Sequence, residues 1–254
     1  MEARDIKEID AERLELIRQM EQLLSCPCRL FRPAEEDDEL TEAYREARQR
    51  GAARGFTPVL VRCDDLLLES IVEAAGADTE GEGFSQRALE DYRRSLLATP
   101  LPEAESLFSP VREITGADRA AMAEGGELAG FSACWDERTG HTDFVLLAEL
   151  PVKKPWEVFA WLPMGGWNAC PGPLAMMAMA KVWAERYGAW PAAVSHDTLD
   201  FALPAPAPEG DCLTLAAVQA RFCPERVSDC GEGASLGRLA GDLARSAVWT
   251  FFWD

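Results

Sequence analysis

The chain has 254 residues, with 44 Asp and Glu against 25 Lys and Arg, and its formal net charge is -19. This sign argues against nucleic acid as a partner, because phosphate recognition needs clustered Lys and Arg. No apolar run reaches the roughly 20 residues of a membrane-spanning helix, so we expect no membrane insertion. Eight cysteines and an N-terminus charged from its second residue indicate reduced thiols in the cytoplasm.

The acidic excess is greatest in the first half of the chain. Residues 1–128 hold 16 Lys and Arg against 29 Asp and Glu, a net of -13, and residues 129–254 hold 9 against 15, a net of -6. Solubility is the simpler explanation for an acidic surface. The functional explanation is another protein with a basic surface, which such a field attracts. Composition does not determine the oligomeric state.

Residues 1–110 form a predicted N-terminal acidic region of helices and short strands. Apolar spacing predicts a helix that ends near Ser25, a short strand over 28–31, a helix over 37–55 and a strand over 56–63. Asp64 or Asp65 caps the next helix, over 65–76, and Ser85 opens another over 85–97. Residues 99–128 mix Pro, Gly and acidic groups, which is typical of a connection.

Residues 129–254 are richer in apolar residues and form the predicted C-terminal α/β domain. The runs over 144–150 and 156–162 are apolar on both faces, as covered strands are, and strands are also predicted over 191–195, 199–203 and 247–254. Helices are predicted over 173–188, around Leu215 and around Leu239. The expected fold class is α/β, with α+β as the alternative: a mixed, largely buried sheet flanked by helices and containing the C-terminal strand. The two regions are either separate domains or one compact unit.

Four long motifs in the C-terminal region resemble one bacterial family. They are "LLAELPVKKPWEVFAWLPMGGWNACP", "YGAWPAAVSHDTLDF", "RFCPERV" and "SAVWTFFWD". With the weaker "ARGFTPVLV" and "LLLES", they are similar to the family called domain of unknown function 4253 over most of residues 36–254. The resemblance implies a soluble bacterial protein. It implies no activity, cofactor or catalytic residue.

The segment "GGWNACPGP" between an apolar run and a predicted helix is the first candidate site. Gly165, Gly166, Trp167 and Asn168 are its candidate ligand- or partner-binding residues. Free backbone N–H groups before a helix can hold an anion, although the segment lacks a phosphate-binding fingerprint and its prolines remove donors. The alternative is that the loop only turns the chain. Most of the eight tryptophans are expected in the core, and Trp167 is the one expected at the surface.

A thiol and an imidazole form the candidate catalytic set. Cys170 directly precedes the predicted helix, where a positive helix end can lower the pKa of a thiol. His196 and Asp197 follow the predicted strand over 191–195. If that strand runs parallel to the strand before the glycine loop, both loops open at one edge of the sheet. Cys170 is then the nucleophile, His196 the base, and Asp197 or Asn168 the orienting group. A buried structural cysteine is the alternative.

No metal site and no cofactor are predicted. The chain has two histidines without metal-ligand spacing, and Cys26, Cys28, Cys223 and Cys230 lack the paired spacers of zinc sites. The leading hypothesis is therefore a non-catalytic protein-interaction module, of which an immunity-type role against a basic toxin is one form. The alternative is a hydrolase or acyl-transfer enzyme that uses Cys170 and His196.

Overall fold

The computed structural model describes residues 10–78, 83–109, 113–128, 130–228 and 235–253. Its helices are α1 (Ala11–Leu24), α2 (Asp38–Arg54), α3 (Asp65–Ala74), α4 (Gln86–Ala98), α5 (Ala104–Leu107), α6 (Gly116–Ala121), η1 (Met122–Glu124), η2 (Ser132–Cys134), η3 (Pro155–Ala160), α7 (Pro173–Tyr187), α8 (Glu209–Phe222), α9 (Glu225–Ser228) and α10 (Leu236–Leu243), where η marks a 3-10 helix. Its strands are β1 (Cys28–Phe31), β2 (Thr57–Arg62), β3 (Trp135–Asp136), β4 (His141–Thr142), β5 (Val145–Leu150), β6 (Trp190–Val194), β7 (Thr198–Ala202) and β8 (Val248–Phe252). None of these described helices combines the length and the apolar character that crossing a membrane requires.

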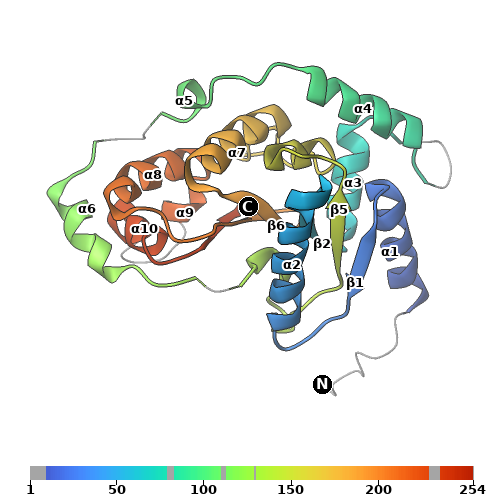
Figure 1. Cartoon of the computed structure of the whole chain (residues 1–254), viewed down its shortest axis with the longest axis horizontal. Coiled ribbons are helices and arrows are strands. Elements are labelled where there is room, and N and C mark those ends of the chain that lie inside the picture. The colour runs from blue at the N-terminus through green and yellow to red at the C-terminus, as the bar shows by residue number, and fades with distance from the viewer. Residues whose placement is uncertain (1–9, 79–82, 110–112, 129, 229–234, 254) are drawn as a thin grey trace.

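Six strands form one mixed sheet in the order β1-β5-β2-β6-β7-β8, and β3 pairs with β4 beside it. β2 and β6 run parallel, while the other neighbours in the sheet are antiparallel. The predicted fold class is confirmed: the sheet is mixed, helices flank it, and β8 brings the C-terminal segment in as an edge strand (Figure 1). Because β2 and β6 are parallel, the segments that follow them emerge at the same edge of the sheet.

The sheet takes strands from both predicted regions. β1 and β2 belong to residues 1–110, and the other four strands belong to residues 129–254. β5 lies between β1 and β2, so that Leu147 is opposite Arg29 on one side and Leu60 on the other. The intervening residues 99–128, predicted as a connection, contain the short helices α5, α6 and η1. The two regions therefore share one sheet.

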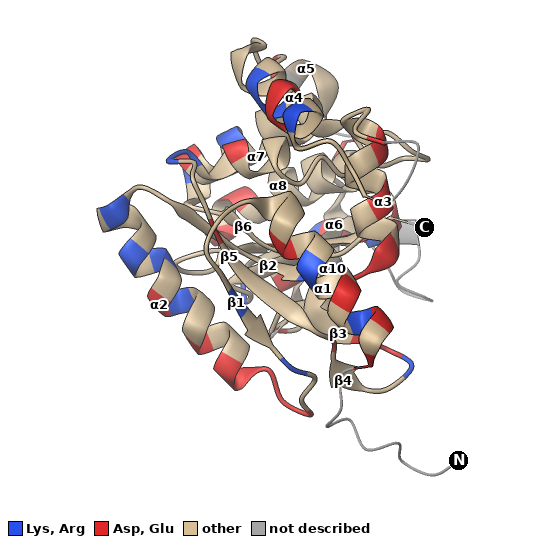
Figure 2. Ribbon diagram, turned by 90° about the vertical axis from the view of Figure 1, so that its right-hand side faces the viewer, with Lys and Arg blue, Asp and Glu red and all other residues tan. Residues whose placement is uncertain are grey.

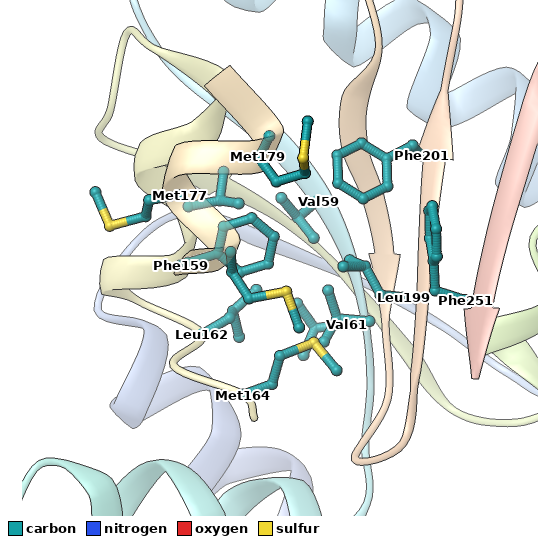
Figure 3. Close-up of a cluster of buried hydrophobic side chains, with 14 of the residues drawn as sticks. Val59, Val61, Phe159, Leu162, Met164, Met177, Met179, Leu199, Phe201 and Phe251 are labelled. Atoms are coloured by element: carbon teal, nitrogen blue, oxygen red, sulfur yellow. The ribbon is translucent and has the colours of Figure 1, made fainter. Parts of the chain in front are cut away.

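One face of the sheet carries the larger apolar core. Val59, Val61, Leu199, Phe201 and Phe251 project from this face toward η3, α7 and the segment after η3 (Figure 3). The indole of Trp183 in α7 stacks on the Phe251 ring at 5.2 Å between centroids. Trp183, Trp249 and Trp253 are all fully buried, so these tryptophans belong to the core.

The opposite face is covered by α2 and by η2. Leu40, Tyr44 and Ala47 of α2 are buried there, and the Tyr44 ring meets the Phe131 ring edge-on at 5.2 Å. This face also contains a polar group, because the buried carboxylate of Asp200 accepts hydrogen bonds from the N–H of Ala133 (2.8 Å) and the hydroxyl of Thr250 (2.6 Å). Asp200 therefore links η2 to the two last strands of the sheet.

The strand predicted over 156–162 is wrong. Residues 155–160 form the 3-10 helix η3, and Val158, Phe159 and Leu162 are buried against the sheet. An apolar run of this length fits a buried helix as well as a buried strand, and periodicity cannot separate the two. Pro155 suits the first turn of a helix, where no N–H donor is required. Consequently, no strand leads into the glycine loop.

Candidate functional site

The glycine loop over residues 165–172 is closed on itself. The N–H of Gly166 donates to the Cys170 carbonyl oxygen (3.0 Å), and the N–H of Cys170 donates to the Trp167 carbonyl oxygen (2.9 Å). Gly165 has φ +89°, and a Cβ there would collide with the carbonyl oxygen of Pro171. The loop therefore uses part of its own N–H groups for turning the chain, and Pro171 supplies none.

Cys170 lies in an environment that disfavours the thiolate. The residue is 4% exposed, and burial raises the pKa of its thiol, helped by the negative charge of Glu225 and by the neighbouring Cys223. The direction of this change is opposite to the lowering expected at the start of α7, because burial disfavours the charged thiolate. Among the described residues, no hydrogen bond joins Cys170 to His196. The proposed dyad remains a prediction without a supporting contact.

His196 instead lies between two carboxylates. Its ring Nδ1 is 2.8 Å from Oδ2 of Asp64, and its backbone N–H donates to the same oxygen (3.3 Å). The other ring nitrogen, Nε2, is 3.2 Å from Oδ2 of Asp197. Both ring nitrogens therefore face carboxylate oxygens, one from each side of the ring.

The fold brings these residues together because β2 and β6 are parallel neighbours. Asp64 follows β2 and is the N-cap of α3, where its Oδ1 accepts from the N–H of Leu67 (2.8 Å). His196 and Asp197 form the turn after β6. The hydroxyls of Ser195 and Thr198 both donate to Oδ1 of Asp197, each at 2.8 Å. Each carboxylate therefore has a local partner on one oxygen and His196 on the other.

A surface cleft of about 360 Å³, here called the His196 cleft, opens beside this set. Leu66, Ser70, Trp167, His196, Asp197, Phe252 and Trp253 line it. Of the predicted site residues, Trp167, His196 and Asp197 are thus brought together. Gly165, Gly166, Asn168 and Cys170 do not line the cleft. Asn168 is exposed, and its φ of +45° places it in the left-handed region that a tight turn requires.

Sequence reasoning missed Asp64 and Leu66 as members of this site. The position of Asp64 after a strand indicated a helix cap, and that prediction is confirmed, but its contact with His196 spans 132 residues of sequence. Leu66 follows it in the first turn of α3 and is 55% exposed. An exposed leucine beside a cap has no local pattern that marks it as functional.

The chemistry available at the cleft is recognition by shape, apolar contact and charge. The carboxylates of Asp64 and Asp197 already accept hydrogen bonds from within the chain, and His196 is held by both. Over the described residues, no group of three or more potential metal ligands occurs. Cys230, one of the cysteines considered from the sequence, lies outside the described residues. The aromatic and leucine side chains supply the contact surface.

Comparison with known proteins gives one match. No curated protein and no solved structure matches the chain. A family model described as "Domain of unknown function (DUF4253)" matches residues 146–254. The matched range begins with β5 and contains the glycine loop, the β6–β7 turn and β8, and it excludes Asp64 and α3. The resemblance to this family that the sequence motifs indicated is therefore confirmed over residues 146–254, the C-terminal part of the chain.

Proposed function

We propose that the chain is a protein-interaction module that binds a basic partner at the His196 cleft. One observation carries this proposal: Leu66 (55% exposed) and Phe252 (43% exposed), two of the large exposed apolar side chains, open into the same concave site as Trp167. Single exposed apolar residues are ordinary on protein surfaces, whereas a cluster in a cleft is the arrangement of an interface anchor pocket.

The charge around the cleft supports a basic partner. Helix α3 carries Asp65, Glu69 and Glu73, all exposed and spaced four residues apart, and it contains no Lys or Arg (Figure 2). Like charges at this spacing cost a helix a few tenths of a kcal/mol per pair. A row of positive side chains on a partner would offset that repulsion and speed association. An immunity-type role, in which the chain neutralises a basic toxin, is one form of this function.

The enzyme alternative has less support. A hydrolase built on Cys170 and His196 needs a thiolate within reach of the imidazole. The pKa of Cys170 is raised by burial, and both nitrogens of His196 face carboxylates. If the enzyme alternative holds, Cys170 reacts with iodoacetamide below pH 8. We expect Cys170 to stay unmodified there in the folded protein and to react only after unfolding.

In-cell photo-crosslinking tests the interaction function. A photoreactive phenylalanine analogue replaces Leu66 in one variant and Leu97 in another, because Leu97 on α4 is 40% exposed and does not line the cleft. We expect position 66 to capture one protein with an excess of Lys and Arg, and position 97 to capture none. The variant with Trp167→Ala added to position 66 should lose the adduct. Equal capture at both positions, or none at position 66, contradicts the proposal.

A further inference from the structure

The junction between α1 and β1 holds a second group of reactive side chains, far from the His196 cleft in the sequence. Cys26 and Cys28 flank Pro27, and both cysteines are half-buried. The thiol of Cys28 lies against Cys26, with its Sγ 3.4 Å from the Cys26 carbonyl oxygen. Cys28 and Pro27 also line a surface cavity of about 140 Å³, so this junction lies at the protein surface.

Arg93 of α4 is the unusual neighbour of this pair. It is 6% exposed, its Nη2 donates to the Leu23 carbonyl oxygen (2.6 Å), and its guanidinium lies 4.9 Å over the Trp161 ring. In the part of the chain that the structure describes, this guanidinium makes no salt bridge to a carboxylate. Burial lowers the pKa of Arg93 only to about 10, so the group is cationic at neutral pH. A buried cation without a paired anion is costly, and Cys26 and, more weakly, Glu90 are the ionisable neighbours that can offset its charge.

We propose that Cys26 and Cys28 form a redox-active dithiol in which Cys26 is the nucleophilic thiolate, Arg93 its counter-ion and Cys28 the resolving thiol. The pKa of Cys26 is lowered, first by the hydrogen bond from the Cys28 thiol and then by Arg93. The pKa of Cys28 is raised, first by its contact with Cys26 and then by burial. The other described cysteines, Cys63, Cys134, Cys170, Cys212 and Cys223, all have pKa values raised by burial.

The co-reactant is a low-molecular-weight disulfide. The Cys26 thiolate attacks one sulfur of this disulfide, forms a mixed disulfide and releases one thiolate. The Cys28 sulfur then loses its proton and attacks Cys26, which closes the Cys26–Cys28 disulfide and releases the second small thiol. Two electrons leave the protein dithiol and reduce one small disulfide to two thiols. No other oxidant is required.

The spacing of the two cysteines favours a reversible bond. Two residues apart, their Cα atoms are separated by at most about 7 Å in an extended chain. This limit coincides with the upper end of the Cα separations that disulfides accept, about 6.8 Å. A bridge across a fully extended stretch of this length therefore lies at the limit of disulfide geometry and is strained. Strained and exposed disulfides are the ones that thiols reduce readily.

Alkylation followed by peptide mapping of the full chain tests the nucleophile. Trypsin releases residues 19–29 as one peptide, which contains Cys26 and Cys28 and no other cysteine. We expect the alkylation–pH profile of Cys26 in the protein to lie at lower pH than in a synthetic peptide of the same sequence. Cys28→Ala and Arg93→Gln should each move the profile to higher pH, and Arg94→Gln, an exposed neighbour, should not. If Arg93→Gln does not fold, Cys28→Ala and the wild-type profile decide the question.

Treatment with oxidised glutathione tests the second step. In the wild type, we expect the 19–29 peptide to lose the mass of two hydrogen atoms. Cys28→Ser should accumulate glutathione on Cys26, and Cys26→Ser should react more slowly at Cys28. A Cys26 profile that coincides with that of the free peptide overturns the proposal. Equal glutathione transfer to Cys28 in Cys26→Ser and to Cys26 in Cys28→Ser does so as well.

Discussion

The two faces of the sheet are stabilised in different ways. On the face that packs against α7 and η3, the contacts are apolar, and aromatic rings such as Phe201, Phe251 and Trp183 meet at 5.2–5.7 Å between centroids. On the face that packs against α2 and η2, Asp200 is buried among apolar groups and binds η2 through one carboxylate. One face depends on packing and the other on a hydrogen-bonded polar group.

Both faces of the sheet stabilise the fold, so we expect partner recognition at another part of the molecule. Helices pack on both faces of the sheet, so we expect a partner to contact it where strands end. The His196 cleft lies at such an end, beside the N-terminus of α3 and the end of β8. The neighbouring residues Phe251 and Phe252 show the contrast within one strand, since the first is fully buried and the second is 43% exposed.

Truncation of these two phenylalanines gives the largest expected effect. Phe251→Ala removes a ring that contacts Trp183, Phe201, Phe222 and Trp253, and we expect the free energy of unfolding to fall by about 3–5 kcal/mol. Phe252→Ala, its neighbour of the same type, should cost less than about 1 kcal/mol. Chemical denaturation of both variants measures the difference. Similar losses would show that the packed face does not dominate stability.

The stability of the face that contains Asp200 should depend on pH. Burial raises the pKa of Asp200 to about 7, against 3.8 for an ordinary Asp. Because the folded pKa is the higher one, the neutral carboxyl stabilises the fold in acid, and this contribution is lost as pH rises through about 7. At pH 8 the full shift corresponds to about 4 kcal/mol at most, at 1.36 kcal/mol per unit.

Asp200→Asn tests this account, since a neutral amide can keep both hydrogen bonds, to the Ala133 N–H and to Thr250. We expect the variant to be a few kcal/mol more stable than the wild type at pH 8, about 1–2 kcal/mol more stable at pH 5, and nearly equal to it only below about pH 4. Thermal or urea unfolding across this range measures both. A variant that is less stable than the wild type at pH 8 would contradict the raised pKa.

Asp64 has two roles, as the N-cap of α3 and as the partner of His196 beside the cleft, and two substitutions can separate them. Asp64→Ala removes the cap of α3 together with the partner of His196, and we expect a loss of about 1–2 kcal/mol. Asp64→Asn keeps a capping oxygen but loses the negative charge, so its loss should be smaller. The difference between the two variants, measured by urea unfolding, gives the weight of the cap. Equal losses would assign the whole effect to His196.

Local patterns predicted the elements that end in distinctive residues. The helix cap at Asp64, the cap at Ser85, and α7 between Pro173 and Gly188 are confirmed, because each depends on a side chain or a backbone angle within one turn. The C-terminal strand is confirmed as well, because its apolar character predicts pairing into the sheet. The prediction of a strand over 156–162 was wrong because the segment is apolar on every side. Its apolar residues therefore show no period that distinguishes a helix from a strand.

The candidate site was only partly predictable. His196 and Asp197 follow a strand, and Trp167 lies in a glycine loop, so their types and positions pointed to an edge of the sheet. The pairing of Asp64 with His196 depends on β2 and β6 being neighbours, and no local pattern encodes the order of strands. The same holds for Arg93, which approaches Cys26 only because α4 packs back across the end of α1.

The smallest expected effect concerns the acidic row of α3. Glu69→Lys places a positive charge in the middle of this row, where a basic partner would meet it, and exposed charge pairs contribute only about 0.2–1 kcal/mol. For the partner captured through position 66, we expect roughly two- to fivefold weaker binding at low salt, mostly through slower association, with the difference shrinking as salt is added. Glu127→Lys makes the same change of net charge at an exposed residue outside α3 and the cleft, so it should bind as the wild type does. Surface plasmon resonance at two salt concentrations compares the three proteins. If both variants weaken binding equally, the partner responds to the overall charge of the chain, and α3 loses its special role. If only Glu69→Lys does, the recognition surface is local and lies at the edge of the sheet, where the packing that stabilises the fold ends.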